Sequence, residues 1–270
     1  MGVRYRGGCC SPPDFQAALA VSRPLLRIRE PRRQRADPEA TTRAVTQSLA
    51  LSHLAPLASK LHNKMAPRDH IATYILAGGK SSRMGRDKAM LAPGGIPLLM
   101  RTAALLAPLA GPPTIIGPPT RYSALGYNVI PDDTPGIGPL GGIATALRHS
   151  NQPWNLIVGC DLPFLTSEWL DYLTARAVES KADAMIPESD AGPEPLCAMY
   201  RKTCVTAILA AITGGTRKVS DAVAALKIDS VPPRDWKPFD ESGRLFKNMN
   251  TPEDFEEADA ILEDELGGEA

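Results

Sequence analysis

The stretch Ile71-Ala-Thr-Tyr-Ile-Leu-Ala-Gly-Gly-Lys-Ser-Ser-Arg-Met-Gly-Arg-Asp-Lys88 joins an apolar run to a glycine-rich segment. The run from Ile71 to Ala77 is rich in β-branched residues, which predicts a buried strand that ends at a glycine loop. Gly78, Gly79 and Gly85 permit a close approach of the backbone to a ligand. Backbone N–H groups in such a loop bind phosphate oxygens, and Arg83 and Lys88 add positive charge. The stretch therefore predicts a phosphate-binding loop after a buried strand.

The chain that follows alternates short apolar runs with segments of helical spacing. This pattern predicts a three-layer α/β fold, in which a mostly parallel, twisted, Rossmann-like sheet has helices on both faces. Ligands of such folds bind beyond the carboxyl ends of the strands. Strands are expected at 113–116, 127–130, 155–160, 182–186 and 196–200; helices at 97–109, 140–148, 167–180 and 203–212; and a last helix from Thr251.

The N-terminal quarter of the 270-residue chain has a different composition. Residues 1–64 hold 11 Lys and Arg against 4 Asp and Glu, whereas residues 65–270 hold 19 against 26. This asymmetry predicts a basic extension over residues 1–66, disordered or weakly helical near Thr41–Leu61, joined to one domain over residues 67–270. A transit peptide and a translation start at Met65 are the alternatives.

Cysteine usage and hydropathy indicate the cellular compartment in which the protein is expected. The five cysteines (Cys9, Cys10, Cys160, Cys197 and Cys204) are odd in number and lack the spacing of metal ligands, which favours reduced thiols in a cytoplasmic protein. No run is apolar enough, for long enough, to span a bilayer. We expect neither a membrane nor a nucleic acid as a partner.

Three acidic residues follow predicted strands and are candidates for ligand contacts. Asp161 ends the apolar run in Ile157-Val-Gly-Cys-Asp-Leu-Pro-Phe164, where a lone buried charge would be costly without a partner. A magnesium ion is such a partner, and it prefers carboxylate and phosphate oxygens. Asp132 and Asp133 lie in a glycine- and proline-rich segment, where turn formation is the alternative role. For Asp161 the alternative is a helix cap or turn acid.

Two segments of the chain partly match common phosphate-binding motifs. A Walker A loop ending at Gly79-Lys80-Ser81 requires a glycine where this chain has Tyr74, so that motif is excluded. A G-x-G-x-x-G pattern does occur at Gly136–Gly141, before a predicted helix and with Asp161 20 residues further on. It leaves a nicotinamide-dependent dehydrogenase as an alternative.

The segment 76–88 resembles the Leu-Ala-Gly-Gly-x-Ser-x-Arg-Met-Gly-x-Asp-Lys signature of the molybdenum cofactor guanylyltransferases (MobA-type), which belong to the nucleotidyltransferase superfamily. The similarity extends from about Ile71 to about Leu262 through a Cys-Asp-x-Pro-Phe segment, an Asp-x-x-Pro-Gly-x-x-Gly-Pro-Leu-x-Gly segment and an Asn-x-Asn-Thr-Pro-Glu segment.

The resemblance implies roles for individual residues. Lys88, Arg83 and Asp161 are implied as catalytic, and Asp161 as the ligand of Mg²⁺. Asn248 and Asn250 are implied to contact the acceptor, although Asn250-Thr251 also has the makings of a helix cap. The GTP contacts that the resemblance implies are Leu76, Ala77, Gly78, Gly79, Lys88, Asp132 and Asp161, with Asp133 as the alternative to Asp132.

We therefore expect a cytoplasmic enzyme, monomeric or weakly associating, that transfers GMP from GTP to the phosphate of molybdenum-loaded molybdopterin. Transient contacts with molybdoenzymes or cofactor chaperones follow from the same resemblance. The alternatives are a CTP-dependent molybdopterin cytidylyltransferase, which requires only different base contacts, and a non-catalytic carrier of the cofactor.

Overall fold

The computed structural model describes residues 70–78, 87–240 and 242–267, which all fall within one compact unit, residues 52–270. The predicted extension over residues 1–66 and its boundary lie outside the described residues and stay predictions. Residues 79–86, with Gly79, Arg83 and Gly85, also lie outside them.

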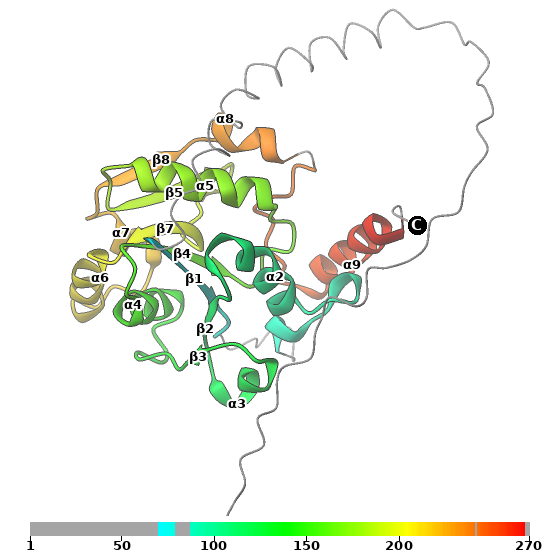
Figure 1. The fold of residues 1–270 in the computed structure, drawn as a ribbon, viewed down its shortest axis with the longest axis horizontal. Coiled ribbons are helices and arrows are strands. Elements are labelled where there is room, and N and C mark those ends of the chain that lie inside the picture. The colour runs from blue at the N-terminus through cyan, green and yellow to red at the C-terminus, as the bar shows by residue number, and fades with distance from the viewer. Residues whose placement is uncertain (1–69, 79–86, 241, 268–270) are drawn as a thin grey trace, which may run out of the picture. The chain divides into compact units, whose positions relative to one another are not determined.

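An eight-stranded sheet lies at the centre of the described residues (Figure 1). The strand order is β3-β2-β1-β4-β7-β5-β6, and β8 pairs with β5. Only β7 and β6 run antiparallel to their neighbours in this part of the chain, which confirms the mostly parallel sheet. The strands are β1 (Ile71–Leu76), β2 (Thr114–Ile116), β3 (Val129–Ile130), β4 (Trp154–Gly159), β5 (Ala184–Ser189), β6 (Gly192–Pro193), β7 (Cys197–Arg201) and β8 (Ile228–Val231).

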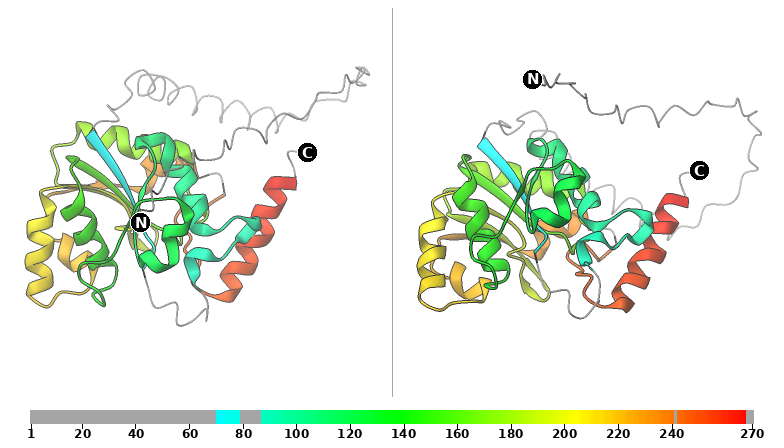
Figure 2. Two further views of the ribbon diagram at one scale, coloured as in Figure 1. Left: turned by 60° about the horizontal axis from the view of Figure 1, so that its bottom comes forward. Right: turned by 90° about the horizontal axis from the view of Figure 1, so that it is seen from below.

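Helices cover both faces of the sheet, which confirms the three layers (Figure 2). On one face the core contains side chains of α2 (Leu98–Ala110), α5 (Ser167–Glu179) and α8 (Pro233–Trp236), together with Tyr122 of α3 (Pro119–Tyr122). On the other face it contains side chains of α4 (Pro139–His149), α6 (Cys204–Thr213) and α7 (Val219–Val223).

The strands divide their side chains between the two cores by simple alternation. In β4, every residue of which is buried, Leu156 and Val158 join the core under α2 and α5, whereas Ile157 joins the core under α4. Successive side chains of a strand point to opposite faces, so a strand covered on both sides is mostly apolar. The one polar side chain of β4, Asn155, donates to the Tyr200 carbonyl at 3.2 Å. Full burial of each such side chain stabilises the fold by about 1.5–3 kcal/mol.

The C-terminal helix α9 (Pro252–Gly267) packs beside the short 3-10 helix η4 (Pro93–Gly95) and the start of α2 (Figure 1). Its N-terminus forms a reciprocal cap, in which the Thr251 hydroxyl accepts from the Asp254 amide at 3.2 Å and an Asp254 carboxylate oxygen accepts from the Thr251 amide at 2.8 Å. Backbone donation from Asn250 is the main cause that lowers the pKa of Asp254. The cap therefore fixes the residues just before α9.

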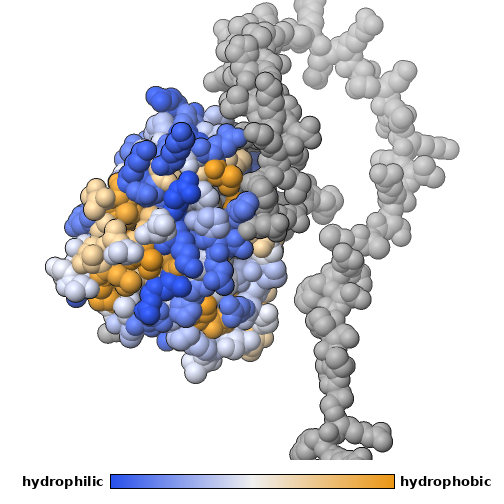
Figure 3. All heavy atoms as spheres, turned by 60° about the vertical axis from the view of Figure 1, so that its left-hand side comes forward, coloured by the Kyte–Doolittle hydropathy of each residue, from blue (hydrophilic) through white to orange (hydrophobic). Residues whose placement is uncertain are grey.

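Helix α6 is apolar in sequence but only partly covered. Cys204 and Ile208 are buried, while Val205, Leu209 and Ile212 pack against the core with part of their surface exposed. The side of the molecule that carries α4 and α6 shows hydrophobic groups among hydrophilic ones (Figure 3). Within the described ranges, none of the helices is both long enough and apolar enough for a membrane span.

Candidate functional site

The candidate site lies where three parallel strands end. β1 and β4 are paired in register up to Leu76 and Gly159, so the residues that follow them emerge side by side. The Cys160 amide donates to the Leu76 carbonyl at 3.4 Å, and the Ala77 amide donates to the Ile116 carbonyl at 2.9 Å. Asp161, Ala77 and Gly78 are thereby brought to one edge of the sheet, as the sequence predicted for strand-terminal residues.

Lys88 and Asp161, which are 73 residues apart in the chain, meet at this edge. The Lys88 Nζ lies 3.0 Å from Asp161 Oδ2 and donates to Asn250 Oδ1 at 2.8 Å. The exposed fractions are 17% for the Lys88 side chain and 24% for the Asp161 side chain, so both reach solvent. The cation and the carboxylate are accessible to a ligand, and their pairing offsets the cost of partial burial.

The Asp161 carboxylate rests directly on the backbone of Gly159. A Cβ added to Gly159 would lie 2.6 Å from Asp161 Oδ1, so a larger residue would displace the carboxylate. On the other side of the residue, the Met249 amide donates to the Asp161 carbonyl at 3.0 Å, which ties the 248–250 segment to the end of β4. No motif predicts this role of Gly159, although the glycine stands two residues before Asp161 in the sequence.

Cys160, between these two residues, is not a nucleophile. Burial, and then the nearby Asp161 charge, raise the pKa of its thiol to about 12. The thiolate is the reactive form of cysteine, and it is scarce at neutral pH in this environment. Its 8% exposed surface agrees with the predicted role as a small apolar residue in the core.

Asp87 supports Lys88 from the preceding position. Its carboxylate accepts from the Ala89 amide at 3.2 Å and so caps the 3-10 helix η3 (Lys88–Met90). The same carboxylate contacts the hydroxyl of Tyr122 and lies 3.5 Å from an Arg121 guanidinium nitrogen. No sequence motif points to Tyr122, because this residue belongs to a short helix that is far from the glycine loop along the chain.

Part of the backbone of residues 76–78 is already hydrogen-bonded within the protein. The Ala77 amide and the Leu76 carbonyl bond to neighbouring strands, and the Leu76 side chain packs on α4, where a Cβ added to Gly142 would lie 3.1 Å from it. Gly78 is exposed, and neither of its backbone groups has a hydrogen-bond partner among the described residues. Gly78 is therefore the most accessible backbone of the predicted GTP contacts that the structure describes.

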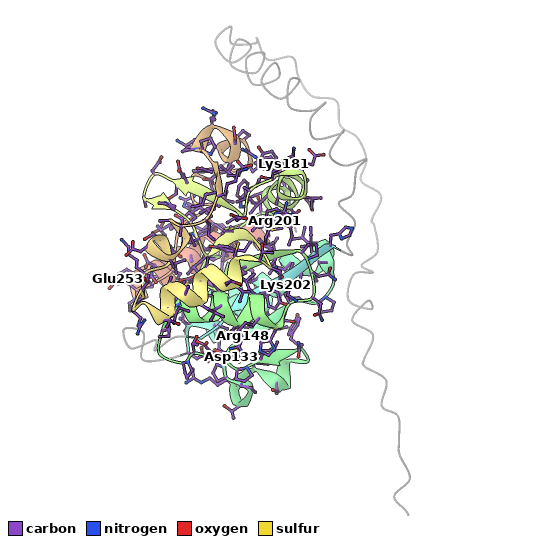
Figure 4. The ribbon with its side chains drawn as sticks, turned by 90° about the vertical axis from the view of Figure 1, so that its left-hand side faces the viewer. Asp133, Arg148, Lys181, Arg201, Lys202 and Glu253 are labelled. Atoms are coloured by element: carbon purple, nitrogen blue, oxygen red, sulfur yellow. The ribbon has the colours of Figure 1, made fainter. Side chains whose placement is uncertain are left out.

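Asp132 and Asp133 have different partners. Asp132 Oδ1 accepts from the Thr134 amide at 2.9 Å and from the Thr145 hydroxyl at 3.1 Å, so it is anchored at the loop before α4. The Asp133 carboxylate instead lies 3.2 Å from an Arg148 nitrogen and 3.3 Å from His149 Nε2, both at the end of α4. Figure 4 shows Asp133 and Arg148 side by side. Asp133 is thus engaged in surface pairing, which leaves Asp132 as the better candidate.

In the 248–251 segment the structure shows the helix cap, whereas the acceptor contact of Asn248 and Asn250 stays a prediction. Thr251 takes part in the cap of α9, and Asn250 directs its side-chain oxygen to Lys88. Asn248 is exposed close to Asp161, since the next residue, Met249, bonds to the Asp161 carbonyl. Asn250 therefore contacts the Lys88–Asp161 pair through its side chain, and Asn248 is near Asp161 along the backbone.

Glu194 adds a second carboxylate near Asp161. It is half-buried, and its Oε1 accepts from the Ser189 hydroxyl at 2.6 Å. Burial is the main cause that raises the pKa of Glu194, and the charge of Asp161 raises it further, against the lowering effect of Ser189. This carboxylate stands at the start of the segment that leads into β7.

A cavity of about 520 Å³ lies elsewhere, between the start of α5, the 238–242 segment and α9. None of the predicted site residues lines it. Among the described residues, no group of three or more His, Cys, Asp or Glu side chains could hold a metal by itself. The predicted site residues that the structure describes therefore lie at the ends of the strands and not in this cavity.

Comparison with known proteins identifies the family. Residues 73–228 match the family model of the MobA-like NTP transferase domain. A probable molybdenum cofactor guanylyltransferase of Deinococcus radiodurans is 35% identical over 198 residues, which cover 73% of this chain and 97% of the relative. One of Nostoc sp. is 34% identical over 194 residues, which cover 69% and 89%.

A solved structure agrees with the sequence relatives. The crystal structure of molybdopterin-guanine dinucleotide biosynthesis protein A from Archaeoglobus fulgidus matches with a TM-score of 0.63 and 28% sequence identity. The match covers 70% of this chain and 97% of that chain. The chain therefore belongs to the MobA-like NTP transferase family of nucleotidyltransferases, to which the molybdenum cofactor guanylyltransferases belong.

Proposed function

We propose that this enzyme transfers GMP from GTP to the phosphate of molybdenum-loaded molybdopterin and releases pyrophosphate. The observation that supports the proposal most strongly is the 3.0 Å contact between Lys88 Nζ and Asp161 Oδ2 at the ends of β1 and β4. A cation that binds phosphates and a carboxylate that binds a metal are the two groups that nucleotidyl transfer requires. The relatives are named for guanylyl transfer and for molybdopterin-guanine dinucleotide, which supports GTP as the nucleotide and molybdopterin as the acceptor.

The reaction is an in-line displacement at the α-phosphorus of GTP. A phosphate oxygen of the acceptor forms the new P–O bond, the bond to the β-phosphate bridging oxygen breaks, and pyrophosphate leaves with that electron pair. The protein contributes positioning and charge stabilisation rather than a covalent intermediate. Lys88, released from Asp161 by the incoming nucleotide, offsets the charge that develops on the phosphate oxygens. Arg83 has the same proposed role.

The residues at this edge fit a magnesium ion. Asp161 offers a carboxylate and Asn250 an amide oxygen, and both already meet a cation at the Lys88 ammonium. Magnesium is usually held by one or two carboxylates together with substrate phosphates and water. When bound at Asp161, it supplies positive charge to the triphosphate and orients it.

The remaining contacts divide between the two substrates. On the nucleotide side, the backbone of Leu76, Ala77 and Gly78 is proposed to hold guanine or ribose, with Asp132 as a further contact of the guanosine and Gly79 as a further contact of GTP. On the acceptor side, Asn248 and Asn250 are proposed to hold the pterin. We further propose a cytoplasmic location, transient contact with molybdoenzymes or cofactor chaperones, and a single transferase domain over residues 67–270 with a basic extension.

A pyrophosphate-release assay tests the proposal. Purified protein, magnesium and molybdenum-loaded molybdopterin are combined with each nucleoside triphosphate in turn. We expect release with GTP, dependence on both acceptor and magnesium, and a product of GMP joined to the cofactor by mass spectrometry. A preference for CTP would replace the guanylyl with the cytidylyl assignment. Binding of NADH without binding of GTP would support the dehydrogenase alternative instead.

A further inference from the structure

Tyr122 joins two points of the chain on either side of residues 79–86. Its side chain is fully buried, with 0% of its surface exposed. The hydroxyl oxygen lies 2.9 Å from the carbonyl oxygen of Ala77, just after β1, and 2.9 Å and 3.0 Å from the two carboxylate oxygens of Asp87, just before Lys88. One side chain from α3 thus contacts both the end of β1 and the residue that precedes the catalytic lysine.

The hydroxyl acts as a donor to these oxygens. A phenol has one proton and can donate it to one acceptor at a time, and a carboxylate is the stronger acceptor. Burial, and then the hydrogen bond and charge of Asp87, raise the pKa of Tyr122 well above its ordinary value. The hydroxyl is therefore protonated at neutral pH and can donate to these oxygens.

The ring of Tyr122 has little freedom to move. A Cβ added to Gly117 would lie 2.9 Å from Tyr122 Cε2 and 3.2 Å from the Ala77 carbonyl oxygen, so the ring packs directly on the backbone after β2. The Gly117 amide is itself fixed, because it donates to the Ile130 carbonyl at 3.0 Å. The sheet therefore holds the ring, and the ring holds the hydroxyl at a defined point.

Asp87 transmits this position to Lys88. One of its carboxylate oxygens receives the Ala89 amide at 3.2 Å, so the carboxylate is held by Tyr122 from the sheet side and by the first turn of η3 from the other. Lys88 is the residue between Asp87 and Ala89 and is therefore fixed at its backbone by these two contacts. Its ammonium then extends to Asp161 and Asn250.

We propose that Tyr122 is a positioning residue, whose hydroxyl holds Asp87 at the end of β1 and thereby directs Lys88 toward Asp161 and the nucleotide phosphates. Tyr122 touches no substrate in this role. Its kinetic consequence rests on the proposed nucleotidyl transfer, whereas the position of Lys88 is measurable without any substrate.

Replacement Tyr122→Phe removes only the hydroxyl, and Tyr172→Phe is the matched control. Tyr172 also contacts a charged partner, Arg176 at 3.1 Å, but lies on α5. The first measurement is the acylation rate of each lysine in the folded protein, by mass spectrometry after brief treatment with an amine-reactive acetylating reagent. We expect severalfold faster acetylation of Lys88 in Tyr122→Phe and an unchanged rate in Tyr172→Phe. An unchanged rate in both would overturn the proposal.

The second measurement separates positioning from general stability. Pyrophosphate release by Tyr122→Phe should show a kcat about tenfold lower or more, with a smaller change in KM for GTP, because misplacement of a phosphate-stabilising cation acts mainly on the transition state. Tyr172→Phe should keep the wild-type kcat. If Lys88 acetylation rises while the wild-type protein transfers no nucleotide, the proposed function fails and the positioning role stands.

Asp87→Ala covers the case in which Tyr122→Phe does not fold, and a double-mutant cycle adds a further test where it folds. Asp87→Ala removes the acceptor of the hydroxyl and should raise Lys88 acetylation by itself. Adding Tyr122→Phe to Asp87→Ala should raise it no further, since both substitutions break the same contact. Unchanged Lys88 acetylation in Asp87→Ala, or full additivity in the double variant, would overturn the proposal.

Discussion

Two glycine-rich stretches follow strands of the same sheet, and they differ in whether the fold requires their glycines. Gly138, before α4, has a φ of 83°, and a Cβ added to Gly141 would lie 2.6 Å from the Thr134 hydroxyl oxygen. Gly78, after β1, has no left-handed φ, and among the described residues an added Cβ would meet only the Ile116 carbonyl oxygen at 4.0 Å. The fold requires the first two glycines, whereas nothing in the described protein requires Gly78.

This difference decides which motif match is informative. The G-x-G-x-x-G pattern at 136–141 is accounted for by turn geometry and by the packing of a loop on α4, without a dinucleotide. Gly78 keeps an exposed backbone at the edge where Lys88 and Asp161 meet. A glycine that the protein does not need for its own packing is the one expected to make room for a ligand.

The largest expected effect comes from the charged pair beside Gly78. Lys88→Ala and Asp161→Ala should each lower kcat for pyrophosphate release by about 10²–10³-fold, since each removes a group that stabilises developing charge. The GTP dissociation constant should change less in Asp161→Ala than in Lys88→Ala. Lys237→Ala, which removes an exposed lysine on η6 (Lys237–Phe239), is the control and should keep the wild-type kcat.

An unchanged kcat in Lys88→Ala or in Asp161→Ala would contradict the prediction that the edge at Gly78 performs the chemistry. It would favour the non-catalytic carrier, in which the edge at Gly78 binds a cofactor but performs no transfer. Circular dichroism and thermal melting of each variant establish that the fold is intact, so that a loss of turnover reports on the site.

The glycines themselves provide the next test. Gly78→Ala should leave the melting temperature at the wild-type value and weaken GTP binding about tenfold, because a methyl group at an exposed ligand-facing backbone blocks close approach. Gly138→Ala should cost about 1–3 kcal/mol, because a φ of 83° with a ψ of −154° lies in a region open essentially to glycine alone. This cost lowers the melting temperature by roughly 2–12 °C. Calorimetric titration and thermal melting measure both. A loss of stability in Gly78→Ala equal to that in Gly138→Ala would remove the distinction.

Much of this arrangement could be predicted from local sequence. Apolar runs with β-branched residues marked β1 and β4, and the motifs that end at Lys88 and Asp161 indicated two strand ends that meet. The antiparallel direction of β7 could not be predicted, because the alternation of Cys197 to Arg201 is the same in both directions. β8 was missed because its Asp229 and Ser230 interrupt the apolar pattern; Asp229 is paired with Arg176 of α5.

The residues that hold the site in place could not be predicted from local sequence, and the reason is physical. Tyr122 reaches Asp87 across 35 residues, and the contact depends on how α3 packs against the end of β1. No periodicity or motif encodes such a tertiary approach. Asn250 was ambiguous for a similar reason, because a residue before a helix cap has the same sequence whether or not its side chain faces a lysine 162 residues away.

The smallest expected effect asks whether the second stretch also touches the nucleotide. Asp132→Asn should weaken GTP binding about two- to tenfold, which is the range for one hydrogen bond to a polar ligand group, while magnesium dependence stays unchanged. Asp133→Asn should leave the affinity for GTP unchanged. It should lower the free energy of unfolding by no more than about 1 kcal/mol, because Asp133 pairs with Arg148 and His149 at the surface. The opposite order of affinities would assign the contact to Asp133. Equal, wild-type affinities in both variants would confine nucleotide binding to the edge at Gly78, and the loop before α4 would then be left with a purely structural role.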